Sequence, residues 1–412
     1  MSNSVSSFGY CTNVHAGSSL DQAKENLERH AVSVRQQVQP NGLFPVGLWL
    51  SEPVADAMIA GGQVREFGDW LGQHGLVPYT FNGFPQGDFH QPVVKHAVYE
   101  PTWCCQSRAR YTMCLAEIME AILPSGQSGS ISTLPLGWPH APWHAENLKN
   151  AADNLLQVAH FLQRLTDKNG CEIALAIEPE PGCVLNTAVE LVEFFEHYLF
   201  SGADEEIARR YLTVCHDICH SGVMFEPQVE ALELYRNSGI RIGKVQVSSA
   251  VHVPWDQCTG DAEQQARMLE QLRGFDEPKY LHQTTRSNAA GKLDALSPDL
   301  PSALAQWLPG KSTIAYPDQP WRVHFHVPIF VEQFGQLSTT QSDIWDATQY
   351  LESHAQESVA GAPWFTSHYE VETYAWPVLP SSLAENDLAS GIAKELRYFA
   401  SVKQKCTPAS TV

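Results

Sequence analysis

The segment LTVCHDICHSGVM, residues 212–224, decides the expected fold. Its first four residues form a short apolar run rich in β-favouring side chains, which predicts a buried strand. Ser221 and Gly222 then predict the exit from that strand into a loop. Between the apolar run and Ser221 lie four residues able to bind a metal or move a proton: His216, Asp217, Cys219 and His220.

A carboxylate and a histidine at D-x-x-H spacing, where a parallel strand ends, are typical of the catalytic face of an α/β barrel. Asp217 and His220 have this spacing. In the alternative interpretation, Asp217 caps a helix and the buried histidine bonds a backbone carbonyl. Further candidate ligands at other strand ends favour the first interpretation.

Strand-like and helix-like segments alternate along the chain, which is the pattern of a parallel sheet with crossover helices. This alternation predicts an α/β fold, a (β/α)8 TIM barrel, in a single domain over residues 1–412. The rival, a doubly wound open sheet, would carry a glycine-rich phosphate loop after its first strand, and the sequence has none there. The eight strands are expected at residues 8–15, 44–50, 76–81, 130–136, 172–178, 212–215, 241–248 and 367–376.

A long insertion, residues 251–365, interrupts the alternation between the seventh and eighth strands. It contains the pattern HFH at 324–326, inside a strand-like run at 321–330, where alternation puts both histidine rings on one side. Because the flanking strands carry other candidate ligands, we expect the insertion to pack over the C-terminal rim rather than to form a separate domain.

The net charge is −20, from 46 acidic and 26 basic residues. Nucleic-acid binding depends on Lys and Arg neutralising phosphates, so no nucleic-acid partner is expected. No stretch reaches the length of about 18 apolar residues that a membrane span needs. The N-terminal sequence also lacks the regions of a secretory signal. Ten scattered cysteines without C-x-x-C spacing indicate reduced thiols, and we expect a cytoplasmic protein.

Oxygen ligands recur at one end of four successive strands: Glu178, Asp217, Gln246 and Glu372. Glu178 shares its face with Ala174 and Ala176, and small residues on that face suit a barrel interior. Three converging carboxylates would repel one another unless a divalent cation lay between them. Oxygen ligands favour Mn²⁺ or Mg²⁺, whereas histidine ligands favour Zn²⁺, Fe²⁺ or Co²⁺. In the alternative interpretation, some of these carboxylates pair with Lys244 or Arg322.

Histidines form a second group of candidates. A lone histidine is more often a satisfied polar residue than a ligand, but the paired rings of HFH favour function. Six histidines fall at the ends of expected strands or in the loops that follow them: His15, His90, His220, His282, His324 and His326.

Five motifs follow one another along the chain: IEPEPG (177–182), HDICH (216–220), VQV (245–247), HFH (324–326) and VET (371–373). Together they resemble the xylose-isomerase-like TIM-barrel superfamily, which includes sugar isomerases, epimerases and metal-dependent apurinic-site endonucleases. With GYCTNVH (9–15) and TFNGFP (80–85) added, the set is similar to the metabolite-traffic protein EboE family.

The resemblance implies a metal-dependent isomerase or epimerase acting on a small oxygen-rich metabolite. Gln246 stands where the epimerases and endonucleases usually have histidine, and an amide oxygen binds a metal more weakly and cannot shuttle protons. The roles expected are catalytic for Glu372, Glu178 and His220; substrate-binding for His15, His90 and His324; and metal-binding for Glu178, Asp217, Gln246, His326 and Glu372.

An enzyme is the favoured interpretation, in which a bound divalent ion (Mn, Zn, Co, Fe or Mg) acts as a Lewis acid and a carboxylate moves the proton. The second interpretation is a non-catalytic carrier that holds a metabolite in the same pocket. A metal-dependent phosphodiesterase is the third, and the strongly negative charge weakens it.

Overall fold

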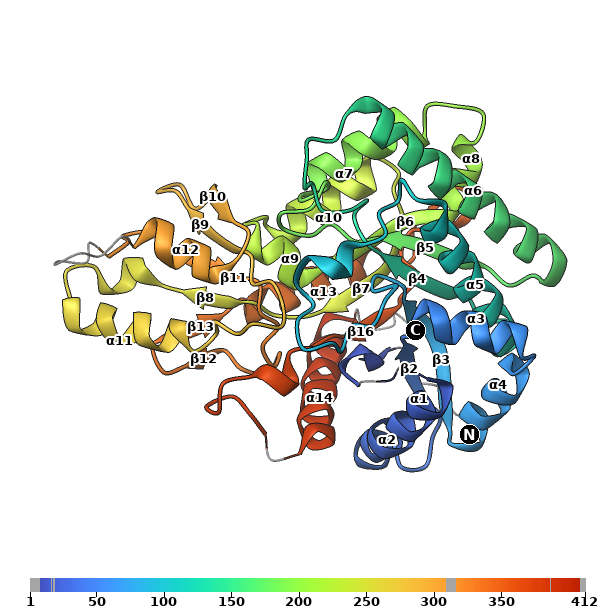
Figure 1. Cartoon of the computed structure of the whole chain (residues 1–412), viewed down its shortest axis with the longest axis horizontal. Coiled ribbons are helices and arrows are strands. Elements are labelled where there is room, and N and C mark those ends of the chain that lie inside the picture. The colour runs from blue at the N-terminus through green and yellow to red at the C-terminus, as the bar shows by residue number, and fades with distance from the viewer. Residues whose placement is uncertain (1–7, 16, 18, 309–315, 386, 408–412) are drawn as a thin grey trace.

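The computed structural model describes residues 8–407 apart from 16, 18, 309–315 and 386. Its centre is a closed barrel of parallel strands in the order β1-β16-β7-β6-β5-β4-β3-β2, which confirms the predicted (β/α)8 TIM barrel (Figure 1). The barrel strands are β1 (Phe8–Cys11), β2 (Phe44–Leu48), β3 (Leu76–Asn82), β4 (Gly129–Thr133), β5 (Ile173–Ile177), β6 (Leu212–Asp217), β7 (Ile242–Val247) and β16 (Tyr369–Val371).

Helices cover the outside of the barrel. Apolar residues of strands and helices share one large core, in which Leu175 and Ile177 of β5 lie with Leu155 and Leu162. The covering helices are α1 (Leu20–Asn26), α2 (Val32–Val38), α3 (Glu52–Ala60), α4 (Val64–Gln73), α5 (Gln106–Ile122), α6 (Ala145–Asn169), α7 (Ala188–Phe194), α8 (Glu205–Tyr211), α10 (Gln228–Asn237), α13 (Gln341–Ser353) and α14 (Leu388–Cys406).

Short turns of other helix types complete this layer. The π-helical turns η2 and η4 continue α1 and α7, and η1 directly follows β1. None of the helices within the described residues is long and apolar enough to cross a membrane. All ten cysteines are unpaired. The turns are η1 (Thr12–Val14), η2 (Leu27–Ala31), η3 (Lys95–Tyr99), η4 (Phe195–Leu199), η5 (Trp255–Cys258) and η6 (Trp376–Val378).

The expected loop at Ser221 and Gly222 is wrong, because a short helix, α9 (Ile218–Val223), begins directly after β6. The Asp217 side chain caps it: Oδ1 accepts a hydrogen bond from the backbone N–H of His220 at 3.0 Å. Gly222 does not mark a turn. It lets the backbone of α9 approach the Asp343 side chain closely, since a Cβ there would lie 2.9 Å from Oδ2 of Asp343. The helix-cap interpretation of Asp217 is therefore correct for one of its two oxygens.

The insertion builds its own antiparallel sheet and core, with Trp255, Trp321 and Phe325 fully buried. It projects from one side of the barrel, in yellow and orange in Figure 1. Its elements are β8 (Val251–Val253), α11 (Ala262–Arg273), β9 (Thr284–Ser287), β10 (Leu293–Ser297), α12 (Leu300–Trp307), β11 (Trp321–Val323), β12 (Gln333–Phe334) and β13 (Leu337–Thr339), and a small hairpin, β14 (Ser358–Val359) and β15 (Ala362–Pro363), precedes β16.

The last part of the expected insertion, from α13 onward, packs as part of the barrel, although it lies before residue 365. Helix α13 packs against α10 and α14, and its buried residues Ile344, Ala347 and Leu351 belong to the barrel core. Helical spacing of these apolar residues gives α13 the inward face of a barrel helix. The segment with its own sheet therefore ends at β13.

The expected strand across HFH is also wrong, because β11 ends at Val323. The chain turns there, with the N–H of Phe325 donating to the carbonyl of Val323 at 2.8 Å. Phe325 is fully buried in the insertion core, against Phe275 and His282. Anchoring of Phe325 in that core leaves the two flanking histidines free to face the barrel.

Candidate active site and metal centre

A cavity of about 530 Å³ lies at the carboxyl ends of the barrel strands. Barrel and insertion share its wall. The barrel supplies Asn13, Asn82, Glu178, Glu180, His220 and Glu372, and the insertion supplies Tyr280, Leu281, His324 and His326. This is the end of a TIM barrel at which catalytic residues gather.

Three strand-end carboxylates meet beside this cavity: Glu178, Asp217 and Glu372, here called the carboxylate cluster. One oxygen from each lies within 4.8 Å of the others. All three side chains are buried. Oε2 of Glu178 and Oδ2 of Asp217 find no hydrogen-bond partner among the described residues.

Burial and mutual repulsion shift the pKa values of this cluster. Burial, with the charges of Glu372 and Asp217, raises the pKa of Glu178 well above its usual range. Burial, with the charge of Asp217, raises the pKa of Glu372 to about 8. Burial alone would raise the pKa of Asp217, but His220 and His326 outweigh it and the pKa is lowered. Burial and like charge thus favour the protonated form of Glu178 and Glu372, whereas a divalent cation would favour the charged form.

Two asparagines that follow or end other barrel strands hold Glu372. Nδ2 of Asn13 and Nδ2 of Asn82 donate to the same Oε1 atom, at 2.7 and 2.8 Å. Asn13 lies in η1 and Asn82 ends β3. These bonds fix one carboxylate oxygen of Glu372 in place.

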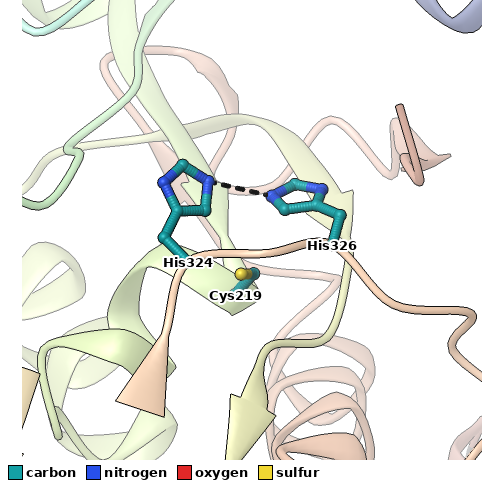
Figure 2. A group of neighbouring side chains, drawn as sticks. All are labelled: Cys219, His324 and His326. Atoms are coloured by element: carbon teal, nitrogen blue, oxygen red, sulfur yellow. Dashed lines mark hydrogen bonds between the residues drawn. The ribbon is translucent and has the colours of Figure 1, made fainter. Parts of the chain in front are cut away.

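Three imidazoles converge next to the carboxylates: His220, His324 and His326, here called the histidine cluster. Nε2 of His324 lies 3.1 Å from Nε2 of His220 and 3.3 Å from Nε2 of His326. Figure 2 shows the two insertion rings facing each other, with the Cys219 sulfur beside them. Asp217 Oδ2 lies 3.7 Å from Nε2 of His220 and 3.9 Å from Nε2 of His326.

The outer nitrogen of each ring is anchored. Nδ1 of His220 lies 2.9 Å from the carbonyl of Pro179, and Nδ1 of His326 lies 2.7 Å from the carbonyl of Glu372. Nδ1 of His324 lies 2.7 Å from Oε1 of Gln283. Burial lowers the pKa of His326 to about 4 and that of His324 well below its usual range.

A second set of contacts fixes Gln283 itself. Its Nε2 donates to Oε1 of Glu180 at 2.9 Å and to the Tyr99 hydroxyl at 3.0 Å. Tyr99 donates to the same Glu180 oxygen at 2.6 Å. Because Nε2 faces a carboxylate, Oε1 of Gln283 must face His324.

Gln246 lies on β7 opposite Asp217 on β6 and Glu370 on β16. Its side chain is fully buried, and neither its oxygen nor its nitrogen finds a partner in the described part of the chain. Of the carboxylate cluster, Asp217 is the residue that pairs with Gln246 in strand register.

His15 and His90, for which a substrate-binding role was expected, are not among the residues that line this cavity. After β1 the chain turns into η1, which carries His15 against Tyr10 and His30 and into a separate cavity. His90 packs edge-on to Trp49 in the loop after β3. His282 is fully buried and bonds Glu277, so its role is structural.

Lys244 and Arg322 do not pair with the carboxylate cluster. Nζ of Lys244 lies 2.7 Å from Oε2 of Glu370. Arg322 lies near Asp343, at 3.9 Å. The alternative interpretation of the cluster as paired ions therefore fails for the residues it named.

Sequence reasoning missed four residues of the site: Asn13, Asn82, Glu180 and Gln283. The two asparagines stand at strand ends like the carboxylates, and that position was the available signal. Glu180 follows Glu178 at alternating spacing, which was a second signal. Gln283 precedes β9 of the insertion, and its sequence has no such signal.

The donor set suits a divalent cation. Buried carboxylate and amide oxygens without partners need a cation or hydrogen-bond donors, and anchored imidazoles are the usual form of histidine ligands. The residues present therefore fit a divalent metal ion, with oxygen donors on one side and nitrogen donors on the other.

No family model matches the chain, and no curated protein matches it either. Several solved structures are similar. A xylose isomerase-like TIM barrel protein from Mycobacterium smegmatis in complex with magnesium is 10% identical over 97% of both chains, with a TM-score of 0.49. A xylose isomerase domain protein from Alicyclobacillus acidocaldarius is 11% identical over 96% of this chain and 99% of that one, with a TM-score of 0.44.

The IolI protein with a binding zinc atom is 13% identical over 58% of this chain and 71% of that one, with a TM-score of 0.37. The assignment of the fold rests on the closed strand order of this chain. The assignment of the site rests on the contacts described above.

Proposed function

We propose that the protein is a metal-dependent enzyme of the isomerase or epimerase type that acts on a small, oxygen-rich metabolite. The single observation that carries the proposal is the carboxylate cluster, whose three buried acids meet beside a cavity at the strand ends. The finer proposal, a role in metabolite processing and traffic, rests on the motifs GYCTNVH and TFNGFP alone, because no family model matches the chain.

The carboxylate cluster, with the Gln246 amide, would hold the metal. A divalent ion bound there would polarise hydroxyl or carbonyl oxygens of the substrate and acidify the C–H bond between them. The cavity is lined by aromatic and apolar side chains with a few convergent polar groups, which is the usual lining of a small-molecule site. We propose that the whole chain acts as one functional unit, with the insertion covering part of this cavity.

The residues of the chain would move the proton. One carboxylate, Glu178 or Glu372, accepts a proton from a substrate carbon, and a protonated carboxyl returns one to the same or the neighbouring carbon. The bonds from Asn13 and Asn82 orient Glu372 for this transfer. The step is redox-neutral overall, because one proton leaves carbon and one returns to carbon. In a shift to the neighbouring carbon, the proton of the adjacent hydroxyl also moves to the former carbonyl oxygen.

Solvent deuterium exchange tests the proposal. The metal-loaded protein would be incubated in D₂O with a panel of small ketoses, aldoses and hydroxy ketones, and incorporation of deuterium at carbon would be followed by NMR. We expect incorporation in at least one substrate, and its loss in Glu178→Gln and Glu372→Gln. Glu226→Gln is the matched control, because Glu226 is a largely buried carboxyl outside the cavity that accepts the N–H of Ala188.

Two outcomes would contradict the proposal. A metabolite that binds by calorimetry without any deuterium incorporation would favour the carrier. Exchange that persists in both glutamine variants would show that the carboxylate cluster does not move the proton.

A further inference from the structure

Five residues that line the cavity pack against one another in a hydrophobic cluster, here called the apolar wall: Phe89, Val94, Val98, Tyr280 and Tyr374. Its buried members, Phe89, Val94 and Tyr280, belong neither to the barrel core nor to the insertion core. The apolar wall is therefore a hydrophobic surface that neither core requires, and it faces the cavity of the candidate active site.

Three segments far apart in the chain supply the apolar wall. The loop after β3 supplies three of its residues, the insertion supplies Tyr280, and the segment after β16 supplies Tyr374. The backbone N–H groups of Val94 and Lys95 both donate to the carbonyl of Lys279, at 2.8 and 3.0 Å. These two hydrogen bonds hold the loop after β3 against the insertion, so the wall is assembled from both parts of the chain.

The three aromatic rings of the wall contact one another. The ring centroids lie 5.1 Å apart for Phe89 and Tyr280, 5.7 Å for Phe89 and Tyr374, and 5.0 Å for Tyr280 and Tyr374. The ring of Tyr374 also lies 4.7 Å from that of His326. The apolar wall thus begins directly beside the histidine cluster, and a molecule held by the polar residues of the cavity would extend onto it.

The apolar wall offers few hydrogen-bond partners to a bound molecule. The side chains of Phe89, Val94 and Val98 have no polar atom, and each of the two tyrosines has a single hydroxyl. A polyol carries a hydroxyl on every carbon, and a hydroxyl buried against such a surface loses its hydrogen bonds to water without replacing them. An alkyl or aryl group gains from the same burial.

The charges around the cavity disfavour a phosphate group. Lys95 is the single lysine or arginine among the described residues that line the cavity. Its Nζ lies 2.6 Å from Oδ2 of Asp299, so its charge is already paired. Phosphate recognition depends on Arg or Lys side chains that donate to the phosphate oxygens. The cavity therefore suits a molecule without an anionic group.

We propose that the substrate of this cavity is a neutral hydroxy ketone or vicinal diol that carries an alkyl or aryl group, rather than a sugar or a sugar phosphate. The oxygens of the substrate lie at the carboxylate cluster, and its apolar group lies against the apolar wall. A few polar groups that fix orientation beside a larger apolar surface are the usual division of a small-molecule site. This inference rests on the proposed function and narrows its substrate class.

A purely structural role of the apolar wall predicts a different behaviour. In that case the wall only holds the loop after β3 against the insertion, and its variants change the affinity for every ligand of the cavity in equal proportion. A wall that binds the substrate affects only those ligands that reach it. The ratio of two affinities therefore separates the two roles.

Three chelators that share one metal-binding group test the inference. Protein reconstituted with Mn²⁺ would be titrated by calorimetry with acetohydroxamate, benzohydroxamate and the hydroxamate of a trihydroxybutanoic acid, each corrected for its affinity for the free ion. We expect benzohydroxamate to bind at least about tenfold more tightly than acetohydroxamate, because enclosing even one methylene in an apolar pocket is worth about that factor. The trihydroxy compound should bind no more tightly than acetohydroxamate.

Variants of the apolar wall sharpen the test. Phe89→Ala and Tyr280→Ala should each lower the ratio of the benzohydroxamate to the acetohydroxamate affinity by about three- to tenfold, since each removes an aromatic contact of the phenyl ring. Val98→Thr, which adds a hydroxyl with little change of shape, should lower it in the same direction. Unchanged binding of acetohydroxamate would show that the fold and the metal site of each variant are intact.

Tyr350→Ala is the matched control. Tyr350 of α13 is a partly buried tyrosine that packs against the barrel core and is not among the residues that line the cavity. The variant should keep the wild-type ratio of the two affinities.

Two results would overturn the inference and leave the proposed reaction standing. One is equal, tight binding of acetohydroxamate and benzohydroxamate to the wild type. The other is a preference for benzohydroxamate that persists unchanged in Phe89→Ala, Tyr280→Ala and Val98→Thr. Failure of all three chelators to bind would instead contradict the metal site of the proposed function, and the inference would fall with it.

Discussion

Two neighbouring layers of side chains inside the barrel differ in whether their buried charges are paired. The lower layer is the one nearer the amino ends of the strands. In it, Lys244 of β7 and Glu370 of β16 form an ion pair at 2.7 Å, with both side chains fully buried. Two residues further along each strand, the upper layer contains Gln246 and Glu372. There the carboxylate cluster meets without any lysine or arginine of the described chain at ion-pair distance.

The difference indicates that the lower layer serves folding and the upper layer serves function. The lower layer is balanced: burial alone would lower the pKa of Lys244, but the charge of Glu370 outweighs it and the pKa is raised. Gly47 makes room for this pair, since a Cβ there would collide with Oε1 of Glu370. The carboxylates of the upper layer have no lysine or arginine partner among the described residues, an arrangement typical of a functional site that a bound cation completes.

The largest effect on the stability of the fold is expected from Lys244→Met. This change leaves Glu370 buried without its partner, which should lower the free energy of unfolding by about 3–5 kcal/mol. Urea denaturation of the metal-free protein would measure it. The double variant Lys244→Met, Glu370→Leu should recover most of the loss, and Glu178→Gln in the upper layer should cost nothing. A single variant as stable as the wild type would mean that the two layers do not differ.

A second effect, on the pH dependence of stability, concerns Glu395 of α14, whose hydrogen bonds connect the upper layer to the insertion. Its Oε1 accepts from the N–H of Ile329 and the hydroxyl of Thr373, and its Oε2 accepts from Nε1 of Trp376. Burial raises the pKa of Glu395 from 4.5 to about 7.

A raised carboxyl pKa means that the folded state holds the proton more tightly than the unfolded state. The stability that this provides is fully present below pH 4.5 and is lost as the pH rises through about 7. The expected loss is on the order of 3 kcal/mol for a shift of this size. Unfolding of Glu395→Gln, followed over the same pH range, should lack this slope, and an identical slope in both proteins would contradict the assignment.

A smaller effect is expected from Gln283→Leu, which removes the acceptor that orients His324. Loss of such an outer contact typically weakens metal binding by about 10–100-fold. Competition titration with Zn²⁺ would measure it, and Gln265→Leu, a buried glutamine in α11, is the matched control. Unchanged affinity in Gln283→Leu would show that the ring of His324 is positioned by packing alone.

The sequence predicts the barrel and the carboxylate cluster well, for a local reason. Alternation along a strand and the position of a strand end are properties of a few consecutive residues, so Glu178, Asp217 and Glu372 can be placed from their own neighbourhoods. The pairing of His324 with His326 was found from the same kind of pattern, although the strand ends before them.

What the sequence could not predict depends on distant contacts. Helix α9 is only six residues long, too short for a periodic pattern, and Asp217 caps it. The three residues of η1 move His15 away from the cavity. Gln283 reaches His324 only because β9 and β11 pair side by side in the insertion sheet. Such pairings across many residues leave no local signal.

Metal content of Asp217→Asn, measured by elemental analysis beside the wild type, tests the central claim most directly. Asp217 is the residue whose carboxylate oxygens lie close both to the carboxylate cluster and to the rings of His220 and His326. We predict that wild-type protein reconstituted with divalent ions retains them after dialysis, and that Asp217→Asn, with its fold intact by circular dichroism, loses at least about nine-tenths of that content. Wild-type metal content in Asp217→Asn would contradict the account of the upper layer as a metal centre.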